Sequence, residues 1–142
     1  MNNESYIRWQ NIRITQLGFA NNLILGISIA LIGFMLDFLQ TDDLVLNSCQ
    51  KFLFWVGGSL TLVSIGFGLY VVFNKLDDFR LTAQIARKRE TGKTDGIEDD
   101  RTESKVLGTK TWNCFIWQVS TLIVGFLLNL VLVLIEIKDI IT

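Results

Sequence analysis

The chain has 142 residues, of which half are apolar and only 19% are charged, and its mean hydropathy is positive. A soluble domain of this length carries more charge and spreads its apolar residues periodically along the sequence. The net charge of −1 provides no overall positive field, so we expect no nucleic acid partner. Histidine is absent and there are only two cysteines, which argues against a metal site, a disulfide scaffold and histidine-based catalysis.

Three apolar segments are each long enough to cross a bilayer. A spanning helix needs about 20 mostly apolar residues to cross roughly 30 Å of hydrocarbon. Segments 17–36, 52–73 and 115–135 meet this length, and none contains Asp, Glu, Lys or Arg. Lipid cannot hydrogen-bond to the backbone, so such segments should be helical throughout. The sequence therefore predicts an all-α integral membrane protein without β-sheet, in which residues 1–142 form one three-helix transmembrane domain.

The first span carries a line of small and polar residues at intervals of three or four. They are Gly18, Asn22, Gly26, Ala30, Gly33 and Asp37. This spacing places them on one helix face. Small residues let helix backbones approach closely, and in lipid such packing is a main source of helix association. We therefore expect a helix-packing seam on this face.

The second span has a similar seam and continues into a polar segment. Its small residues are Gly57, Thr61, Ser64 and Gly68. Residues 74–90 lack Gly and Pro and carry a helical apolar stripe, so the second helix should extend into the cytoplasm. Residues 91–105 are polar, acidic and interrupted by glycine, which predicts a mobile loop. The helix–loop 74–111 is a candidate contact for a cytoplasmic partner.

Three basic residues lie near the C-terminal end of the predicted extended helix: Arg87, Lys88 and Arg89. One interpretation is attraction to anionic lipid head groups, which is worth about 1 kcal/mol per charge near the membrane surface. The other, which we prefer, is that these residues only fix the topology and solvate a helix end.

The third span carries a polar line that ends in a carboxylate. Its members are Gln118, Thr121, Gly125, Asn129 and Glu136, and Thr121 and Gly125 supply the small residues of its seam. The simpler interpretation is interhelical packing. Alternatively, in a ring of several copies, Gln118, Thr121, Asn129 and Glu136 would line a pore. Asp37 and Glu136 would then form acidic rings that favour cations.

The sequence predicts a function without catalysis. No nucleophile has a histidine base beside it, and we expect no cofactor or metal. Three helices bury little surface among themselves, so we expect a homo-oligomer or an accessory subunit of a membrane complex that assembles through the seams. The alternative is an oligomeric ion channel gated through the cytoplasmic loop.

The distribution of Lys and Arg predicts the orientation in the cell membrane. The N-terminal tail and residues 74–114 together hold eleven basic residues, whereas residues 37–51 and the C-terminal tail together hold two. Cytoplasmic segments carry the excess of basic residues. The N-terminus and the 74–111 segment should therefore be cytoplasmic, and the C-terminus should lie outside.

The two cysteines test this topology. Cys49 and Cys114 should lie on opposite sides of roughly 30 Å of hydrocarbon. A membrane-impermeant maleimide added to intact cells should therefore modify Cys49 and leave Cys114 unmodified until the cells are opened. Modification of Cys114 from outside would contradict the predicted orientation.

Overall fold

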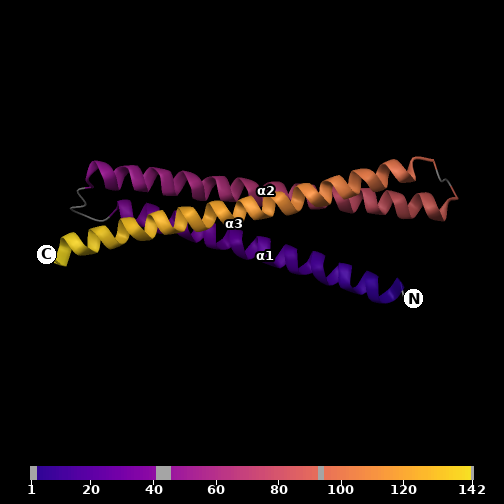
Figure 1. Cartoon of the computed structure of the whole chain (residues 1–142), viewed down its shortest axis with the longest axis horizontal. Coiled ribbons are helices and arrows are strands. Elements are labelled where there is room, and N and C mark those ends of the chain that lie inside the picture. Colours follow the sequence, from indigo (N-terminus) through magenta and orange to yellow (C-terminus); the bar gives the residue numbers. More distant parts are fainter. Residues whose placement is uncertain (1–2, 41–45, 93–94, 142) are drawn as a thin grey trace.

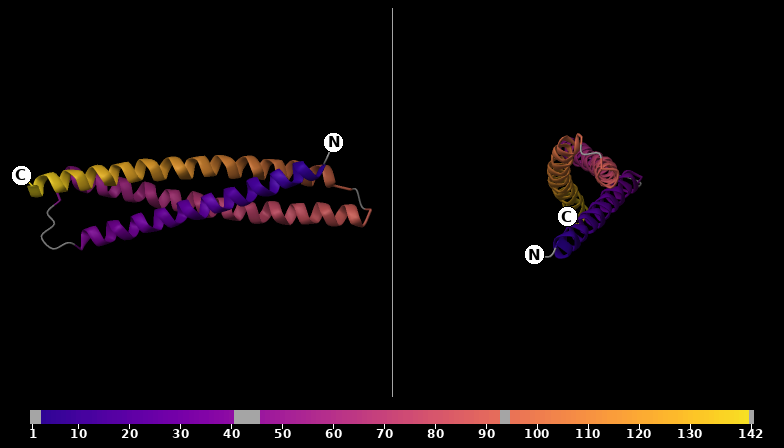
Figure 2. Two further views of the ribbon diagram at one scale, coloured as in Figure 1. Left: turned by 90° about the horizontal axis from the view of Figure 1, so that it is seen from below. Right: turned by 90° about the vertical axis from the view of Figure 1, so that its right-hand side faces the viewer.

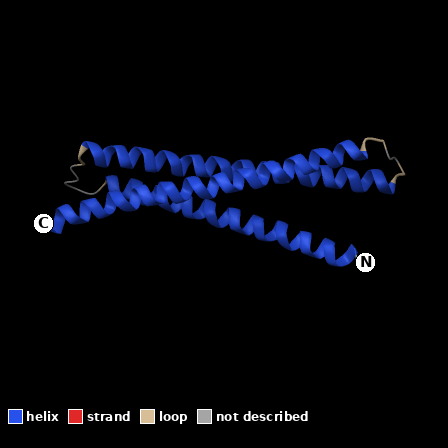
Figure 3. Ribbon diagram, in the orientation of Figure 1, coloured by secondary structure: helices blue, strands red, loops and turns tan. Residues whose placement is uncertain are grey.

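The computed structural model describes residues 3–40, 46–92 and 95–141, with side chains described for 12–40, 46–92 and 95–137. These residues form three helices and no strand, as the sequence predicts: α1 (Asn3–Leu39), α2 (Ser48–Glu90) and α3 (Ile97–Ile141) (Figures 1 and 3). At 1.5 Å per residue the helices are about 55 to 68 Å long, roughly twice the thickness of a hydrocarbon core. Each helix contains a stretch long and apolar enough to cross a membrane.

The helices are arranged as a hairpin with a third helix laid across it. α2 and α3 run antiparallel and pack together along their length, whereas α1 crosses them obliquely (Figures 1 and 2). α1 packs mainly on α2 and touches α3 little, and its N-terminal half diverges from the hairpin. The α2–α3 hairpin is therefore the body of the molecule, and α1 is its least attached element.

A repeat that averages 3.5 residues holds the hairpin together. On α2 the buried residues are Gln50, Phe54, Gly57, Thr61, Ser64, Gly68, Val71 and Asn74. On α3 the facing buried residues are Thr111, Gln118, Leu122, Gly125, Asn129 and Leu132. We call these two sets the α2–α3 seam. A 3.5-residue repeat keeps two helices in contact by a gentle left-handed supercoil.

The residues between the two helices change in character near Asn74 and Thr111. Between these residues and the Gln50 end of the hairpin, the seam is dominated by glycines, hydroxyls and amides. In the stretch nearer the α2–α3 connection, the partly buried residues are apolar ones, Leu81, Ile85 and Leu107, together with the charged and polar ones Asp78, Lys88, Asp100 and Ser104. Leucines and charged pairs between helices suit a segment surrounded by water, and small residues between helices suit one surrounded by hydrocarbon.

The molecule is apolar on its outside over the three apolar segments. Phe19 and Trp55 are 72% and 71% exposed, and many other large apolar side chains point outward. Among the side chains that the structure describes, nine polar ones are buried against six hydrophobic ones. Soluble monomers show the reverse and rarely expose large apolar patches. This distribution supports a membrane location.

The connection between α2 and α3 differs from the prediction. α2 runs unbroken to Glu90, as expected, but the mobile loop predicted for 91–105 is wrong from Ile97 onward, where α3 begins. Gly92 and Gly96 adopt positive φ angles of 68° and 75°, which suit glycine in a tight turn. Three acidic residues, Glu98, Asp99 and Asp100, occupy the first turn of α3 and complement its dipole.

Candidate functional site

Close backbone contact at Gly57 and Gly125 forms the centre of the α2–α3 seam. A Cβ atom on Gly125 would lie 2.9 Å from Thr61 Oγ1 and 3.0 Å from the Gly57 carbonyl oxygen. The Thr61 hydroxyl is held in place because it donates to that same carbonyl oxygen at 2.9 Å. No side chain larger than hydrogen fits at Gly125 unless the helices move apart.

Asn129 packs against the same contact from α3. Its Nδ2 donates to the carbonyl oxygen of Gly125, one turn earlier, at 2.8 Å. A Cβ atom on Gly57 would lie 2.7 Å from this nitrogen, so the glycine makes room for the amide. The Asn129 Oδ1 atom is buried and has no hydrogen-bond partner among the described residues. The amide is therefore held by its own helix and packs into the space that Gly57 leaves on α2.

The three helices meet at Gly68. Asn21 of α1 donates from Nδ2 to the Gly68 carbonyl oxygen at 3.4 Å, and a Cβ atom on Gly68 would overlap the side chains of Gln118 and Leu25. Gln118 is fully buried, and the described residues provide no partner for either atom of its amide. Its backbone carbonyl accepts from Ser64 Oγ at 2.9 Å. This junction attaches α1 to the hairpin, as does the Lys75 ammonium of α2, which donates to the Ile14 carbonyl oxygen of α1 at 3.4 Å.

Steric fit contributes more than hydrogen bonding to this arrangement. Interhelical side-chain hydrogen bonds within membranes average about 0.6 kcal/mol. An unsatisfied buried polar group costs about 1–3 kcal/mol, so the partnerless amide atoms of Gln118 and Asn129 cost at least as much as such a hydrogen bond gains. The amides therefore specify which helix faces meet, and the glycines allow the close packing.

Polar contacts close both ends of the hairpin. At one end Gln50 Nε2 donates to Glu136 Oε2 at 2.9 Å. At the other end Lys88 Nζ lies 2.6 Å from Asp100 Oδ2, and the Ser104 hydroxyl donates to the Asp78 carboxylate. These charged and polar pairs lie outside the apolar spans.

The seam residues predicted on the second and third spans are brought together. Gly57, Thr61, Ser64 and Gly68 are buried and meet Gln118, Gly125 and Asn129. Thr121 is partly buried, and its hydroxyl donates to the Trp117 carbonyl oxygen of its own helix. The predicted pore-lining stripe therefore faces α2 within one chain, and Asp37 is exposed on α1, apart from that stripe.

The seam predicted on the first span faces away from the hairpin. Its members Asn22, Gly26, Ala30, Gly33 and Asp37 are exposed, and we call them the α1 outer stripe. Only Gly18 is partly buried, beside the Lys75 ammonium. Among the described side chains of α1 the buried ones are Asn21, Ser28 and Met35, none of which the predicted seam included. These three residues are spaced seven apart, and this heptad spacing is the sequence pattern that could have indicated the buried face of α1.

The basic cluster lies far from the apolar part of α2. Lys88 is paired with Asp100, whereas Arg87 and Arg89 are exposed. Arg87 follows Phe73 by fourteen residues, or about 21 Å along the helix. This exceeds the screening length of roughly 8 Å in physiological salt. The geometry does not favour contact with lipid head groups along an upright helix.

The described residues contain no group of three or more His, Cys, Asp or Glu side chains that could hold a metal ion. The α2–α3 seam packs two helices of the chain against each other. Comparison with known proteins finds no matching family, no similar curated protein and no similar solved structure.

Because the contact at Gly125 is tight, adding one methyl group there should destabilise the fold more than adding one at an open glycine. Gly125→Ala should lower the free energy of unfolding by about 1–3 kcal/mol, because the helices must separate to accommodate the Cβ atom. Gly66→Ala is the matched control, since nothing lies within 4 Å of its Cβ position and alanine favours the helix. Unfolding by SDS in mixed micelles, followed by tryptophan fluorescence, measures both. Equal effects would contradict the tight seam.

Proposed function

We propose that the chain is a non-enzymatic integral membrane protein that assembles with further copies of itself, or with another membrane subunit, through the α1 outer stripe. The observation that carries this proposal is that the seam residues predicted on α2 are buried against α3, whereas five of the six seam residues predicted on α1 are exposed. A helix face of this composition suits close packing against another helix.

The space around the α1 outer stripe supports the proposal. No atom lies within 4 Å of a Cβ position on Gly26 or Gly33, so a second helix can approach both glycines closely. Asn22 lies on the same face, five residues into the apolar segment, and is exposed. An amide that faces hydrocarbon is poorly solvated, so a polar partner on a neighbouring helix would stabilise it.

The end of the hairpin offers a second surface in the proposed cytoplasmic region. Leu76, Phe79 and Val106 are exposed there, beyond the apolar spans. Exposed apolar side chains beside charged ones are suited to a protein partner. In the proposed orientation this surface would receive a cytoplasmic protein while α1 holds the assembly together in the membrane.

An oligomeric ion channel is the alternative function. Its proposed lining, Gln118, Asn129 and Glu136, packs against α2 or hydrogen-bonds to it within one chain. Exposing these residues to a central axis would require α2 and α3 to separate, so the packing favours assembly over conduction. Ion flux through purified protein in liposomes would support the channel instead.

Substitutions on the α1 outer stripe test the assembly. Gly26→Leu and Gly33→Leu should reduce chemical cross-linking between subunits in membranes at least fivefold, because a branched side chain holds the partner helix away. The monomer should remain folded, since neither glycine packs within the chain. Gly66→Leu introduces the same side chain at an exposed glycine of α2 and should leave cross-linking unchanged. An unchanged cross-linking pattern in both α1 variants would reject the proposal.

A further inference from the structure

An open groove lies on the surface of the hairpin between α2 and α3. It has a volume of about 460 Å³ and is lined by Val63, Gly66, Phe67 and Tyr70 of α2 and by Cys114 of α3. The missing side chain of Gly66 contributes to this space, because no atom lies within 4 Å of a Cβ position there. We call this hollow the α2–α3 groove.

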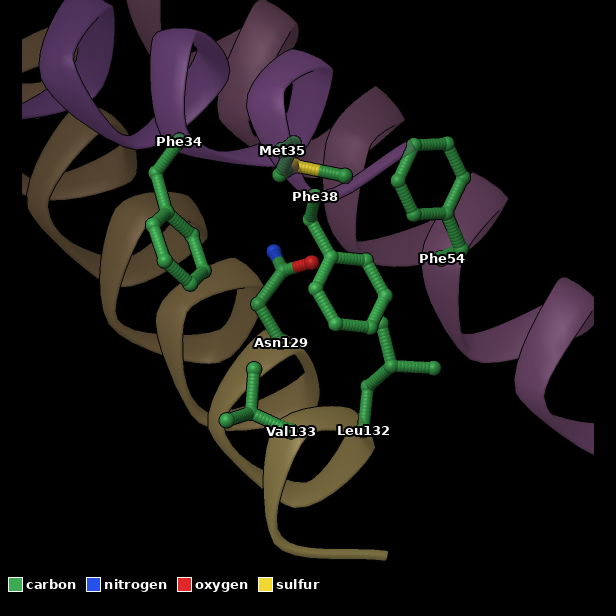
Figure 4. A pocket seen from close by; sticks show the side chains of 7 residues that line it. All are labelled: Phe34, Met35, Phe38, Phe54, Asn129, Leu132 and Val133. Carbon is green, nitrogen blue, oxygen red and sulfur yellow. The ribbon is translucent and has the colours of Figure 1, made fainter. Parts of the chain in front are cut away.

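The groove differs from the interior gap beside Asn129. The side chains that line that gap, among them Phe38 and Leu132, leave no room for a water molecule (Figure 4). The α2–α3 groove, in contrast, is open to the surroundings of the hairpin, and its lining residues Val63 and Tyr70 are 48% and 46% exposed. A ligand can therefore enter this groove from outside while the helices stay packed.

The groove begins at the edge of the apolar segments and runs inward. Cys114 directly precedes the third apolar segment, and Tyr70 lies three residues before the end of the second. From Tyr70 to Val63 the lining covers seven residues, or about 10 Å along α2 toward the middle of its apolar segment. One leaflet of the hydrocarbon core is roughly 15 Å thick. The groove therefore has the direction and the length to hold much of one acyl chain.

A lysine lies at the outer end of the groove. Lys110 precedes Cys114 by four residues, so the two residues share one face of α3 and lie about 6 Å apart along its axis. Lys110 also precedes the third apolar segment by five residues, or about 7.5 Å, and polar head groups occupy roughly 5–8 Å on each side of the hydrocarbon. The Lys110 ammonium therefore lies at the depth of lipid phosphates.

The charge of Lys110 is not balanced within the described part of the chain. Lys110 is exposed and forms no ion pair with a described residue. Asp77 follows Tyr70 by seven residues on α2, but its Oδ1 already lies 3.8 Å from Arg80 Nη1. Since Asp77 and Arg80 offset each other, the positive charge of Lys110 remains in excess at this end of the groove.

We propose that the α2–α3 groove binds an anionic phospholipid, with one acyl chain in the groove and the phosphate beside the Lys110 ammonium. The apolar lining matches the chain, and the excess positive charge favours an anionic head group over a zwitterionic one. A free phosphate ion would meet only the lysine and gain nothing from the apolar groove. This site lies on the hairpin, separate from the α1 outer stripe, and does not depend on the assembly.

Photo-crosslinking with a matched pair of lipids tests the proposal. The purified chain is reconstituted in phosphatidylcholine nanodiscs that contain a trace of phosphatidylglycerol or phosphatidylcholine, each carrying the same diazirine in one acyl chain. Mass spectrometry then identifies the labelled peptides. Labelling of residues 63–70 and of Cys114 should be about fivefold stronger with the phosphatidylglycerol probe, which is the preference expected from one lysine near the membrane surface.

Two variants that remove one charge each locate the head group. Lys110→Gln should bring the ratio of labelling by the two probes to about one, because it removes the excess charge beside the groove. Lys105→Gln is the matched control: Lys105 is also exposed, but it lies five residues farther from the apolar segment and on another face of α3, so the ratio should stay unchanged. Equal labelling of the groove by the two probes in the unmodified chain, or an equal loss of preference in both variants, would overturn the proposal.

Discussion

The near-contact of two helix backbones at Gly57 and Gly125 is the interaction on which the rest of this structure depends. In a hydrocarbon surrounding, burying a leucine gains little, because lipid tails are as apolar as the side chain itself. Helices then associate where small residues permit dense packing, and large apolar side chains are left to face outward. The buried glycines, hydroxyls and amides of the α2–α3 seam, and the exposed phenylalanines and leucines around them, follow from this one constraint.

The same constraint explains why the three helices have different roles. The small residues of α2 and α3 pack against each other, and the two helices form a long hairpin. Beyond Asn74 and Thr111 the partly buried residues of this hairpin include leucine and isoleucine. α1 makes a polar contact with α2 at the Gly68 junction and touches α3 little. An element with few internal contacts is the one most easily rearranged. This is consistent with α1 presenting a surface to a partner.

The sequence located the three apolar segments and the facing seams of α2 and α3, because composition and spacing encode both directly. It did not reveal that α3 begins at Ile97. The polar run after Gly96 resembles a loop when read alone, and its helix is stabilised by packing of Ile97 and Leu107 and by the Lys88–Asp100 pair. The inward face of α1 was also misjudged. Asn21 and Asn22 are adjacent and lie on different faces: Asn21 is buried and donates to the Gly68 carbonyl oxygen, whereas Asn22 is exposed.

Spin-label accessibility along α2 tests the central claim most directly. Single nitroxides would be placed at the exposed positions Leu62, Leu69, Arg80 and Gln84 in a chain whose two cysteines are replaced by serine, reconstituted in lipid bilayers. The account predicts that labels at Leu62 and Leu69 collide mainly with oxygen, which concentrates in hydrocarbon. Labels at Arg80 and Gln84 should collide mainly with a water-soluble nickel complex, with the change near Asn74. If labels at Leu62 and Leu69 were as accessible to the nickel complex as the label at Gln84, the exposed apolar surface would not face lipid and the account would be contradicted.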